Sequence, residues 1–281
     1  MFETFFEILT LSVVQGISEF IPVSSSAHLF LISEIYQFKS KFLLVDLGLH
    51  LGSLLAIVFY FRKDLLNIIN NKNLFTLMFV GSLPIVIVGY IIYETGLISH
   101  LRNIEVISWT TLVFAIILYL VDKFKVKKKF ETDLNLKSIL IIGLLQILAL
   151  IPGVSRSGIV ITAGRLLNFD RYDSTKISFY LSLPAIAGAN FLALKDIRSE
   201  NIEFNIIILI SIIFSFIFSY FTIKYFLIFV KKFTLNFFVF YRIFLSIFFI
   251  LLNLLLIFFE FLELIVKLKH QLKSKNNQLC C

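Results

Sequence analysis

The sequence predicts an all-α, polytopic integral membrane protein with about six transmembrane helices and two re-entrant helix pairs. Of its 281 residues, 59% are hydrophobic and 16% are charged, whereas a soluble domain has about 25% charged residues. Runs such as Leu74–Tyr93 and Phe204–Ile223 contain no Asp, Glu, Lys or Arg. Their lengths match the roughly 17–25 apolar residues that cross the hydrocarbon core. In addition, two short serine-rich loops interrupt apolar segments.

The expected full spans are the long apolar segments, at Leu43–Phe61, Leu74–Tyr93, Val106–Val121, Ile177–Leu194, Phe204–Ile223 and Phe233–Phe259. The segments next to the serine loops, such as Ala27–Ile35 and Ile159–Leu167, are shorter. Helices of about 9–14 residues reach only about 14–21 Å. We therefore expect two re-entrant helix pairs whose tips stop near the midplane, where irregular backbone must line a cavity.

An internal duplication is the second prediction about the fold. Pro22 and Pro152 open the serine loops, and each loop is followed by the tripeptide Ser-Leu-Pro, at Ser82–Pro84 and Ser182–Pro184. Three spans separate the starts of the two repeats, which would invert the second repeat. Chance recurrence in a biased composition is the alternative. The predicted domain covers 1–266, with repeat halves at approximately 1–122 and 137–259, and a basic tail follows at 267–281.

The charged loops predict the orientation of the chain. The 62–73, 122–137 and 224–232 loops have a basic excess, whereas the 94–105 and 195–203 loops have an acidic one. Because Lys and Arg accumulate in cytoplasmic loops, the first three are placed in the cytoplasm and the N-terminus outside. The net charge of +8 therefore does not indicate nucleic acid. The basic tail disagrees, since alternation would place it outside as well.

The first serine loop, Pro22–His28, follows Glu19. Ionisable groups at membrane depth cost roughly 2.5–3.5 kcal/mol each, which makes them candidates for function. Pro22 ends the preceding helix, and Ser24, Ser25 or Ser26 can cap the helix that restarts toward His28. A helix N-terminus flanked by hydroxyl groups suits an anion.

The second serine loop repeats this arrangement and adds a cation. Ser155, Ser157 and Gly158 surround Arg156, whose planar guanidinium can hold two phosphate oxygens at once. Two facing helix N-termini and one arginine predict a site for a phosphate or a diphosphate.

Glu19 and His28 indicate chemistry beyond anion binding. A carboxylate beside a phosphate suits a bridging divalent cation or a general base, and an imidazole can be a nucleophile, a general acid or a proton shuttle. Together with Arg156 they predict phosphoryl transfer, which depends mainly on positioning and charge stabilisation. The alternatives are structural: interhelical hydrogen bonds of the serines, or a buried Glu19–Arg156 ion pair inside a transporter.

The motif Gln15–Leu29 closely resembles the first signature of the undecaprenyl-diphosphatase (bacitracin-resistance) family, and Pro152–Gly158 resembles the second. The similarity also includes Asp46–Ala56 and Tyr241-Arg242, whereas the residues beyond about Leu264 look like an extension. The resemblance implies an enzyme of the bacterial cytoplasmic membrane that acts on its outward side. It would convert undecaprenyl diphosphate to undecaprenyl phosphate and inorganic phosphate, which recycles the lipid carrier for peptidoglycan synthesis and confers bacitracin resistance.

The resemblance also implies the site. Glu19, Ser25, His28 and Arg156 fall on catalytic positions, and Ser24, Ser26, Ser155, Ser157 and Gly158 surround the substrate. Glu19 and Gln15 are the candidate ligands for a divalent cation, Mg²⁺ or Ca²⁺. Gln15 stands where some members have Glu, so it can ligate a metal but cannot act as a base. Val160 stands where the family pattern often has Thr, and Thr162 is nearby. His50 is an accessory candidate, for which a core role is the alternative.

The predicted function is therefore a membrane phosphatase in which His28, Ser25 or a water activated by Glu19 attacks the terminal phosphorus. A type-2 phosphatidic acid phosphatase is disfavoured because no proline follows an arginine. A transporter or flippase for a prenyl phosphate is the rival from another class. The substrate and membrane lipids are the expected partners, nucleic acid is not, and the sequence leaves homo-oligomers open.

Overall fold

The structure is a computed structural model that describes residues 2–36, 42–97, 101–199 and 206–278. Within these ranges every regular element is a helix, apart from one isolated β-bridge between Lys128 and Phe169. The all-α prediction is confirmed. In chain order the helices are α1 (Phe2–Ser18), α2 (Ser25–Tyr36), α3 (Phe42–Tyr60), α4 (Arg62–Asn70), α5 (Lys72–Thr95), α7 (Ile104–Asp122), α8 (Phe130–Asp133), α9 (Leu136–Gln146), the 3₁₀ turn η1 (Ile147–Leu150), α10 (Arg156–Leu166), α11 (Arg171–Ser199), α12 (Ile206–Lys232) and α13 (Asn236–Gln278).

Five described helices, α5, α7, α11, α12 and α13, are long and apolar enough to cross a membrane. A sixth span results if α3 and α4 are counted together, although they meet at a bend of 72°. The prediction of about six spans is thus confirmed. Two details were wrong. Residues 224–232, expected as a loop, are the last turns of α12, and residues 62–70 of the expected 62–73 loop form the nine-residue helix α4. Ile68 and Leu65 of α4 pack against the core, so the chain turns there as a helix.

Both serine loops interrupt pairs of short helices, as predicted. The first loop lies between α1 and α2, and the second lies between η1 and α10. Helix α10 has 11 residues and α2 has 12, so neither is long enough to span a bilayer of about 30 Å. Their re-entrant depth stays a prediction.

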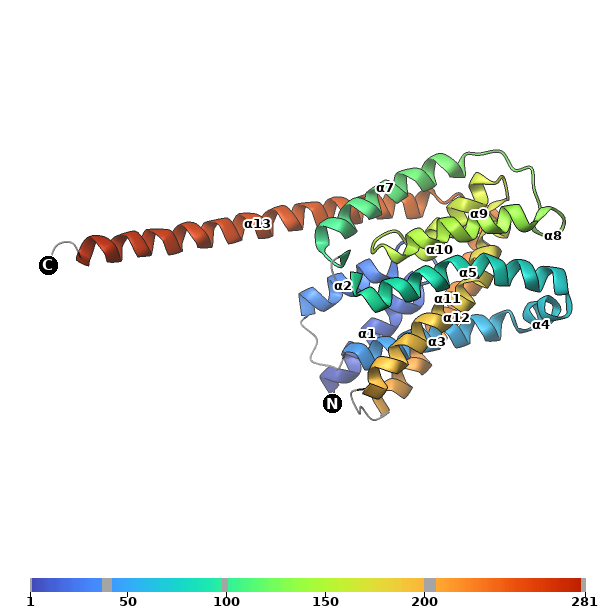
Figure 1. Cartoon of the computed structure of the whole chain (residues 1–281), viewed down its shortest axis with the longest axis horizontal. Helices are drawn as coiled ribbons and strands as arrows, with labels where there is room; N and C mark the ends of the chain where they lie inside the picture. The colour runs from blue at the N-terminus through green and yellow to red at the C-terminus, as the bar shows by residue number, and fades with distance from the viewer. Residues whose placement is uncertain (1, 37–41, 98–100, 200–205, 279–281) are drawn as a thin grey trace.

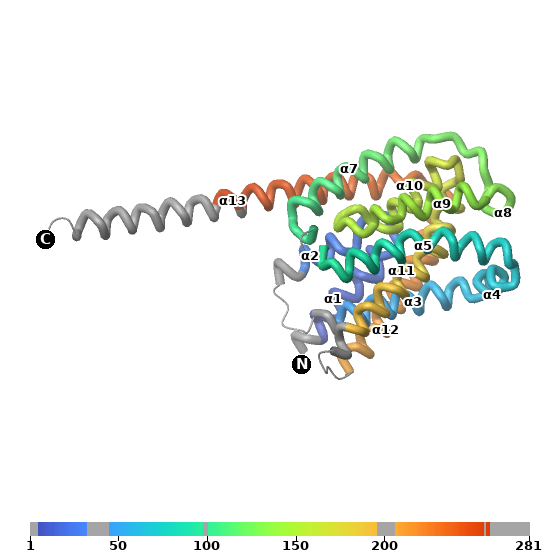
Figure 2. Tube along the Cα trace, in the orientation of Figure 1, coloured from blue at the N-terminus to red at the C-terminus, as the bar shows by residue number. Residues whose placement is uncertain are grey.

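Two helix–helix contacts have the pattern that an internal repeat would produce. Helix α1 packs against α12, and α9 packs against α5. The trace in Figure 2 shows α7 and α13 side by side along one flank of the bundle. A repeat that relates α1 to α9 and α5 to α12 would give these contacts. The inverted repeat itself stays a prediction.

Small and hydroxyl side chains bring α3 and α12 close together. A side chain at Gly52 would collide with the backbone of α12. Beside it the Ser53 hydroxyl lies 3.1 Å from that of Ser215 and 3.0 Å from that of Ser219. Close backbone approach and interhelical hydrogen bonds are the usual means of packing helices in lipid. This seam fixes α3, the helix that follows α2 in the chain.

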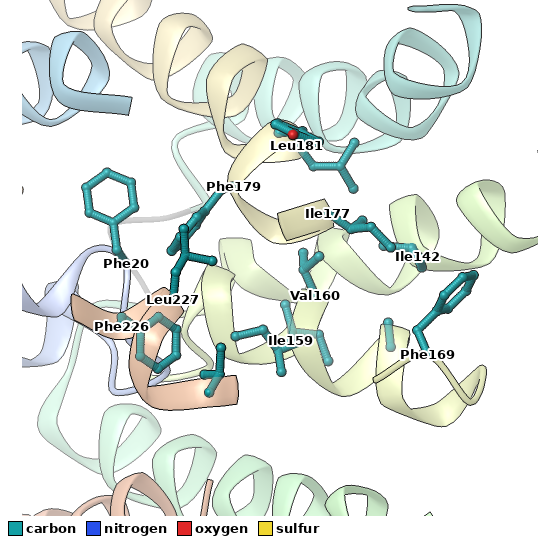
Figure 3. Close-up of a cluster of buried hydrophobic side chains, with 14 of the residues drawn as sticks. Phe20, Ile142, Ile159, Val160, Phe169, Ile177, Phe179, Leu181, Phe226 and Leu227 are labelled. Carbon is teal, nitrogen blue, oxygen red and sulfur yellow. The ribbon is translucent and has the colours of Figure 1, made fainter. Parts of the chain in front are cut away.

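A cluster of buried apolar side chains (Figure 3) includes one residue of each loop, Val23 and Val154. Phe20, which follows Glu19, points into this core and meets the edge of Phe179 at a centroid distance of 5.5 Å. Ile159 and Val160 contribute from α10, directly after the second loop. The core therefore packs directly behind the polar residues and fixes their backbone.

The basic loops gather at one end of the molecule. Figure 1 shows α4 and α8 at the same end of the bundle. Asp122, at the end of α7, pairs with Arg165 and Arg171 at 3.3 and 2.8 Å and accepts a hydrogen bond from the backbone N–H of Leu235. These contacts bring the ends of four helices together, and the side of the membrane on which they lie stays a prediction.

Helix α13 continues without a break from the last predicted span into the basic tail, and its 43 residues end at Gln278. Secondary structure therefore does not mark the boundary predicted at residue 266, which stays a prediction. Residues 279–281 of the tail lie outside the described residues.

Candidate active site

The two serine loops break the chain in the same way. Ser24 and Ser155 have φ angles of 80° and 70°, a region that residues other than glycine seldom adopt. Each serine immediately precedes the first residue of the restarting helix, Ser25 in α2 and Arg156 in α10. Backbone strain of this kind is often found at functional sites, where the surrounding structure holds it in place.

Glu19 is the centre of a hydrogen-bonded cluster. Its Oε2 accepts a hydrogen bond from Ser25 Oγ at 2.8 Å and another from Gln15 Nε2 at 3.1 Å. Its Oε1 pairs with Nη2 of Arg156 at 3.0 Å. Because Glu19 is 8% exposed, these donors replace the water that a buried carboxylate loses. The structure therefore brings Gln15, Glu19, Ser25 and Arg156 together.

Arg156 joins the two loops and keeps one donor unused. Its Nη2 also donates to the backbone oxygen of Glu19 at 3.2 Å, and its Nη1 donates to that of Ser178 at 3.3 Å. Its Nε is buried and has no hydrogen-bond partner among the described residues. A buried donor without a partner costs about 1–3 kcal/mol, so this atom suits an anion that binds in the site.

The serines of the second loop have mainly local partners. Ser155 Oγ accepts a hydrogen bond from the N–H of Gly158 at 3.2 Å, which caps α10 as the sequence predicted. Ser157 Oγ donates to the backbone oxygen of Ile21 at 2.8 Å, and so ties the second loop to the first. Substrate contacts by Ser155, Ser157 and Gly158 stay predictions.

Ser24 and Ser26 lie next to each other in the first loop, with their hydroxyl oxygens 3.2 Å apart. Ser24 is buried, whereas Ser25 and Ser26 are partly exposed. Ser25 and Ser26 therefore present hydroxyl groups to a space that a ligand can enter.

His28 has different neighbours from Glu19. Its Nδ1 lies 2.6 Å from the backbone oxygen of Ser24, and its Nε2 lies 2.6 Å from the hydroxyl of Tyr241, whose ring is parallel to the imidazole. A carbonyl oxygen only accepts, so Nδ1 carries the proton and Nε2 of the neutral ring accepts from Tyr241. Both nitrogens are thus engaged away from the Glu19 carboxylate. The catalytic assignment of His28 stays a prediction.

Two residues of α13 that support the loops were not identified from their chemistry. Arg242 is 1% exposed and donates from Nη2 to the backbone oxygens of Gly153 and Val154, both at 3.1 Å. Tyr241 holds His28. The sequence did contain one signal for them. Arg242 is a lone cation in a long apolar run, and a charged residue within a membrane span usually faces the interior of the bundle.

The residues near Glu19 fit a divalent cation in part. The amide Oε1 of Gln15 is buried and has no partner among the described residues, and Nε2 of the same amide donates to the carboxylate of Glu19. The described residues contain no group of three or more His, Cys, Asp or Glu side chains that could hold a metal ion. Such a pair of oxygen donors matches Mg²⁺, which takes one or two carboxylates and otherwise uses substrate phosphates and water.

Comparison with known proteins identifies the family. The family model for bacitracin resistance protein BacA matches residues 8–248, which include both serine loops and Arg242. An undecaprenyl-diphosphatase of Pelagibacter ubique (strain HTCC1062) is 58% identical over 212 residues, which cover 75% of this chain and 83% of the relative. An undecaprenyl-diphosphatase of Elusimicrobium minutum (strain Pei191) is 43% identical over 201 residues, which cover 68% and 77%.

Another relative, the undecaprenyl-diphosphatase of Alteromonas mediterranea, is 38% identical over 211 residues that cover 70% of this chain and 79% of the relative. The matching family model covers most of the chain, and all three relatives match more than two thirds of it. The chain therefore belongs to the bacitracin resistance protein BacA family.

Proposed function

We propose that this protein is a membrane phosphatase that hydrolyses undecaprenyl diphosphate to undecaprenyl phosphate and inorganic phosphate. The observation that carries the proposal is the cluster of Glu19, Ser25 and Arg156, formed where the two loops of a BacA-family protein meet. It combines a carboxylate, a hydroxyl in hydrogen-bond contact with it, and an arginine with an unused buried donor.

The hydrogen bond from Ser25 to Glu19 supports a role for Glu19 as general base. A nucleophile within hydrogen-bond reach of a base is the usual arrangement for activation. Glu19 would take the proton from Ser25, or from a water at the same place, as the oxygen attacks the terminal phosphorus. The bond from that phosphorus to the bridging oxygen breaks, and undecaprenyl phosphate leaves. If Ser25 attacks, water then hydrolyses the phosphoserine. His28 is the third candidate nucleophile.

Arg156 would bind the phosphoryl oxygens through Nε and stabilise the charge that develops on them. It is itself held by Glu19 and Ser178, so it needs little reorganisation. When bound, a divalent cation, Mg²⁺ or Ca²⁺, would be held by Glu19 and Gln15 and would neutralise part of the phosphate charge.

The prenyl chain would lie in an apolar groove that begins at the first loop. Ile17 and Ile21 line a groove of about 380 Å³ together with aromatic residues of α12, among them Phe221 and Tyr225. The backbone oxygen of Ile21 accepts the hydrogen bond from Ser157, so the groove adjoins the cluster. An apolar lipid chain could thus remain near the bilayer while its diphosphate reaches the polar loops.

The protein is an integral membrane protein, as its apolar helices indicate. We assign it to the bacterial cytoplasmic membrane with the site open to the outward side, because the basic loops mark the cytoplasmic end. Its product would serve peptidoglycan synthesis, and removal of the diphosphate form would give bacitracin resistance. Homo-oligomers stay an open prediction.

A carrier for prenyl phosphate is the second candidate, and the meeting of two broken helices favours it. The test is release of inorganic phosphate from undecaprenyl diphosphate by detergent-purified protein, with and without chelator. We expect cation-dependent release that Arg156→Ala and Glu19→Gln both abolish. Absence of release from folded protein would contradict the phosphatase, and transport of labelled lipid in proteoliposomes would then be measured.

A further inference from the structure

A polar cavity next to the first serine loop shares Ser25 with the Glu19 cluster and extends beyond it. It has a volume of about 120 Å³, and its polar lining consists of Ser25, Ser26, Asp46, His50 and Arg102. Pro152 of the second loop and three apolar side chains complete it. A water takes about 30 Å³ in the liquid, so the cavity has room for a group of the size of one phosphate.

Ser25 is shared by this cavity and the Glu19 cluster. Its hydroxyl donates to Glu19, and the residue also lines the cavity. A diphosphate that binds at Arg156 therefore has a second polar compartment within reach, on a path that passes Ser25. The apolar groove for the prenyl chain shares no lining residue with the cavity, so the two can hold different ends of one molecule.

The side chains of the cavity suit an anion. His50 is held by Asp46, whose backbone oxygen lies 3.0 Å and whose carboxylate lies 3.5 Å from Nδ1. The ring is thereby oriented, and its Nε2 becomes a donor when the ring is protonated. Arg102 provides a second cation from the segment just before α7, whose start is capped by Asn103, which accepts a hydrogen bond from the N–H of Val106 at 2.8 Å. The single carboxylate of Asp46 is paired with His50.

The charge of the substrate gives a reason for these cations. Arg156 is the one cation of the cluster, and its charge is already paired with Glu19 at 3.0 Å. A diphosphate brings several negative charges, and an apolar lining strengthens the interaction with each cation. We infer that the cavity between α2, α3 and the start of α7 is a phosphate subsite in which His50 and Arg102 bind the terminal phosphoryl group before and after its release.

This inference rests on the proposed function but can be tested separately from it. The probe is inorganic phosphate, and the readout is thermal unfolding of the detergent-purified full chain at increasing phosphate, since a ligand of the folded state raises stability in proportion to RT ln(1 + [L]/Kd). The variants are His50→Gln and Arg102→Gln. The matched control is Lys195→Gln, which removes an exposed cation paired with Glu94 that does not line the cavity.

We expect phosphate to stabilise the wild type and the control equally, and to bind each of the two variants about tenfold or more weakly, because a hydrogen bond to a charged group has about that effect. With undecaprenyl diphosphate we expect KM to rise about tenfold in both variants while kcat changes less than threefold. Arg102 is exposed, so its variant should fold even if His50→Gln does not.

Equal stabilisation of wild type and both variants by phosphate would overturn the subsite, whatever the turnover. The subsite would also be overturned if micellar phosphatidylglycerol competes with undecaprenyl diphosphate while inorganic phosphate does not raise the Tm. The cavity would then bind a lipid headgroup. If phosphate binding depends on His50 and Arg102 but the wild type releases no phosphate from undecaprenyl diphosphate, the subsite stands and the phosphatase proposal fails.

Discussion

The two serine loops share a backbone design but divide the chemistry between them. Both contain a serine with positive φ directly before a helix, and both have a buried glutamine nine residues before that serine, Gln15 and Gln146. The first loop carries Glu19, whereas Leu150 stands at the corresponding position of the second. The second carries Arg156 where the first has Ser25. The same backbone arrangement therefore carries a carboxylate and a hydroxyl in the first loop and a guanidinium in the second.

The loops also differ in how firmly they are held. The second loop is fixed from outside: Thr110 donates to the backbone oxygen of Pro152 at 2.6 Å, and Arg242 donates to those of Gly153 and Val154. For the first loop and the residues just before it, the hydrogen bonds described from α10 and α13 are those of Ser157, Arg156 and Tyr241. We infer that the second loop is a rigid platform on which the groups of the first are positioned.

The largest effect should come from the carboxylate that distinguishes the first loop. Glu19→Gln keeps the size of the side chain and an oxygen for Ser25, but removes the base. Phosphate release should fall by about 10²–10⁴, the usual contribution of general acid–base catalysis. The Tm should fall as well, because Arg156 is left as a buried charge without its partner. The control Glu94→Gln alters an exposed carboxylate that is 45% accessible. Wild-type turnover in Glu19→Gln would show that the first loop does not supply the base.

The cation of the second loop should come next. Arg156→Lys keeps the charge beside Glu19 but loses the planar fork, so we expect kcat for phosphate release to fall about 10²–10³. Arg156→Ala should in addition destabilise the protein by about 3–5 kcal/mol, because Glu19 would be left as a buried charge without its partner. Arg62→Lys is the exposed control. Equal activity of Arg156→Lys and wild type would mean that charge alone suffices.

The rigidity of the second loop is tested at Gly153, which has a φ of 91° and no room for a Cβ beside Thr110. Gly153→Ala should lower stability by about 1–3 kcal/mol, measured as a reduced Tm in detergent, and should reduce phosphate release with it. Gly188→Ala is the matched control, since nothing lies within 4 Å of the added methyl group and alanine favours a helix by up to about 1 kcal/mol. A Tm of Gly153→Ala at or above that of the wild type would contradict the rigid platform.

The smallest effect should come from the tyrosine that holds the first loop. Tyr241→Phe removes the hydrogen bond to His28 Nε2, worth about 0.5–1.5 kcal/mol, so kcat should fall less than about tenfold.

The same assay on His28→Gln distinguishes attack by His28 from attack by Ser25 or water. A comparably small loss would leave Ser25 or water as the attacking group, whereas a loss of 10² or more would support attack by His28.

Most of the architecture could be predicted from local sequence. Charge-free runs predict spans because unpaired charges are costly in lipid, and proline with serine predicts a break followed by a capped helix. The helices at both loops began where these rules placed them. The bend between α3 and α4 was missed, because the charged residues of 62–73 are as compatible with a surface helix as with a loop.

What the sequence determined by itself is the chemistry available: a membrane protein with one carboxylate, one imidazole and one arginine in two short breaks. The tertiary structure decided which of these groups meet. Ser25 and His28 lie three residues apart in one helix, yet Ser25 contacts Glu19 while His28 contacts Tyr241 of α13. Asp46 and His50 of α3 line one cavity with Arg102, which precedes α7. Such contacts depend on the packing of helices far apart in the chain, which local residue preferences do not specify.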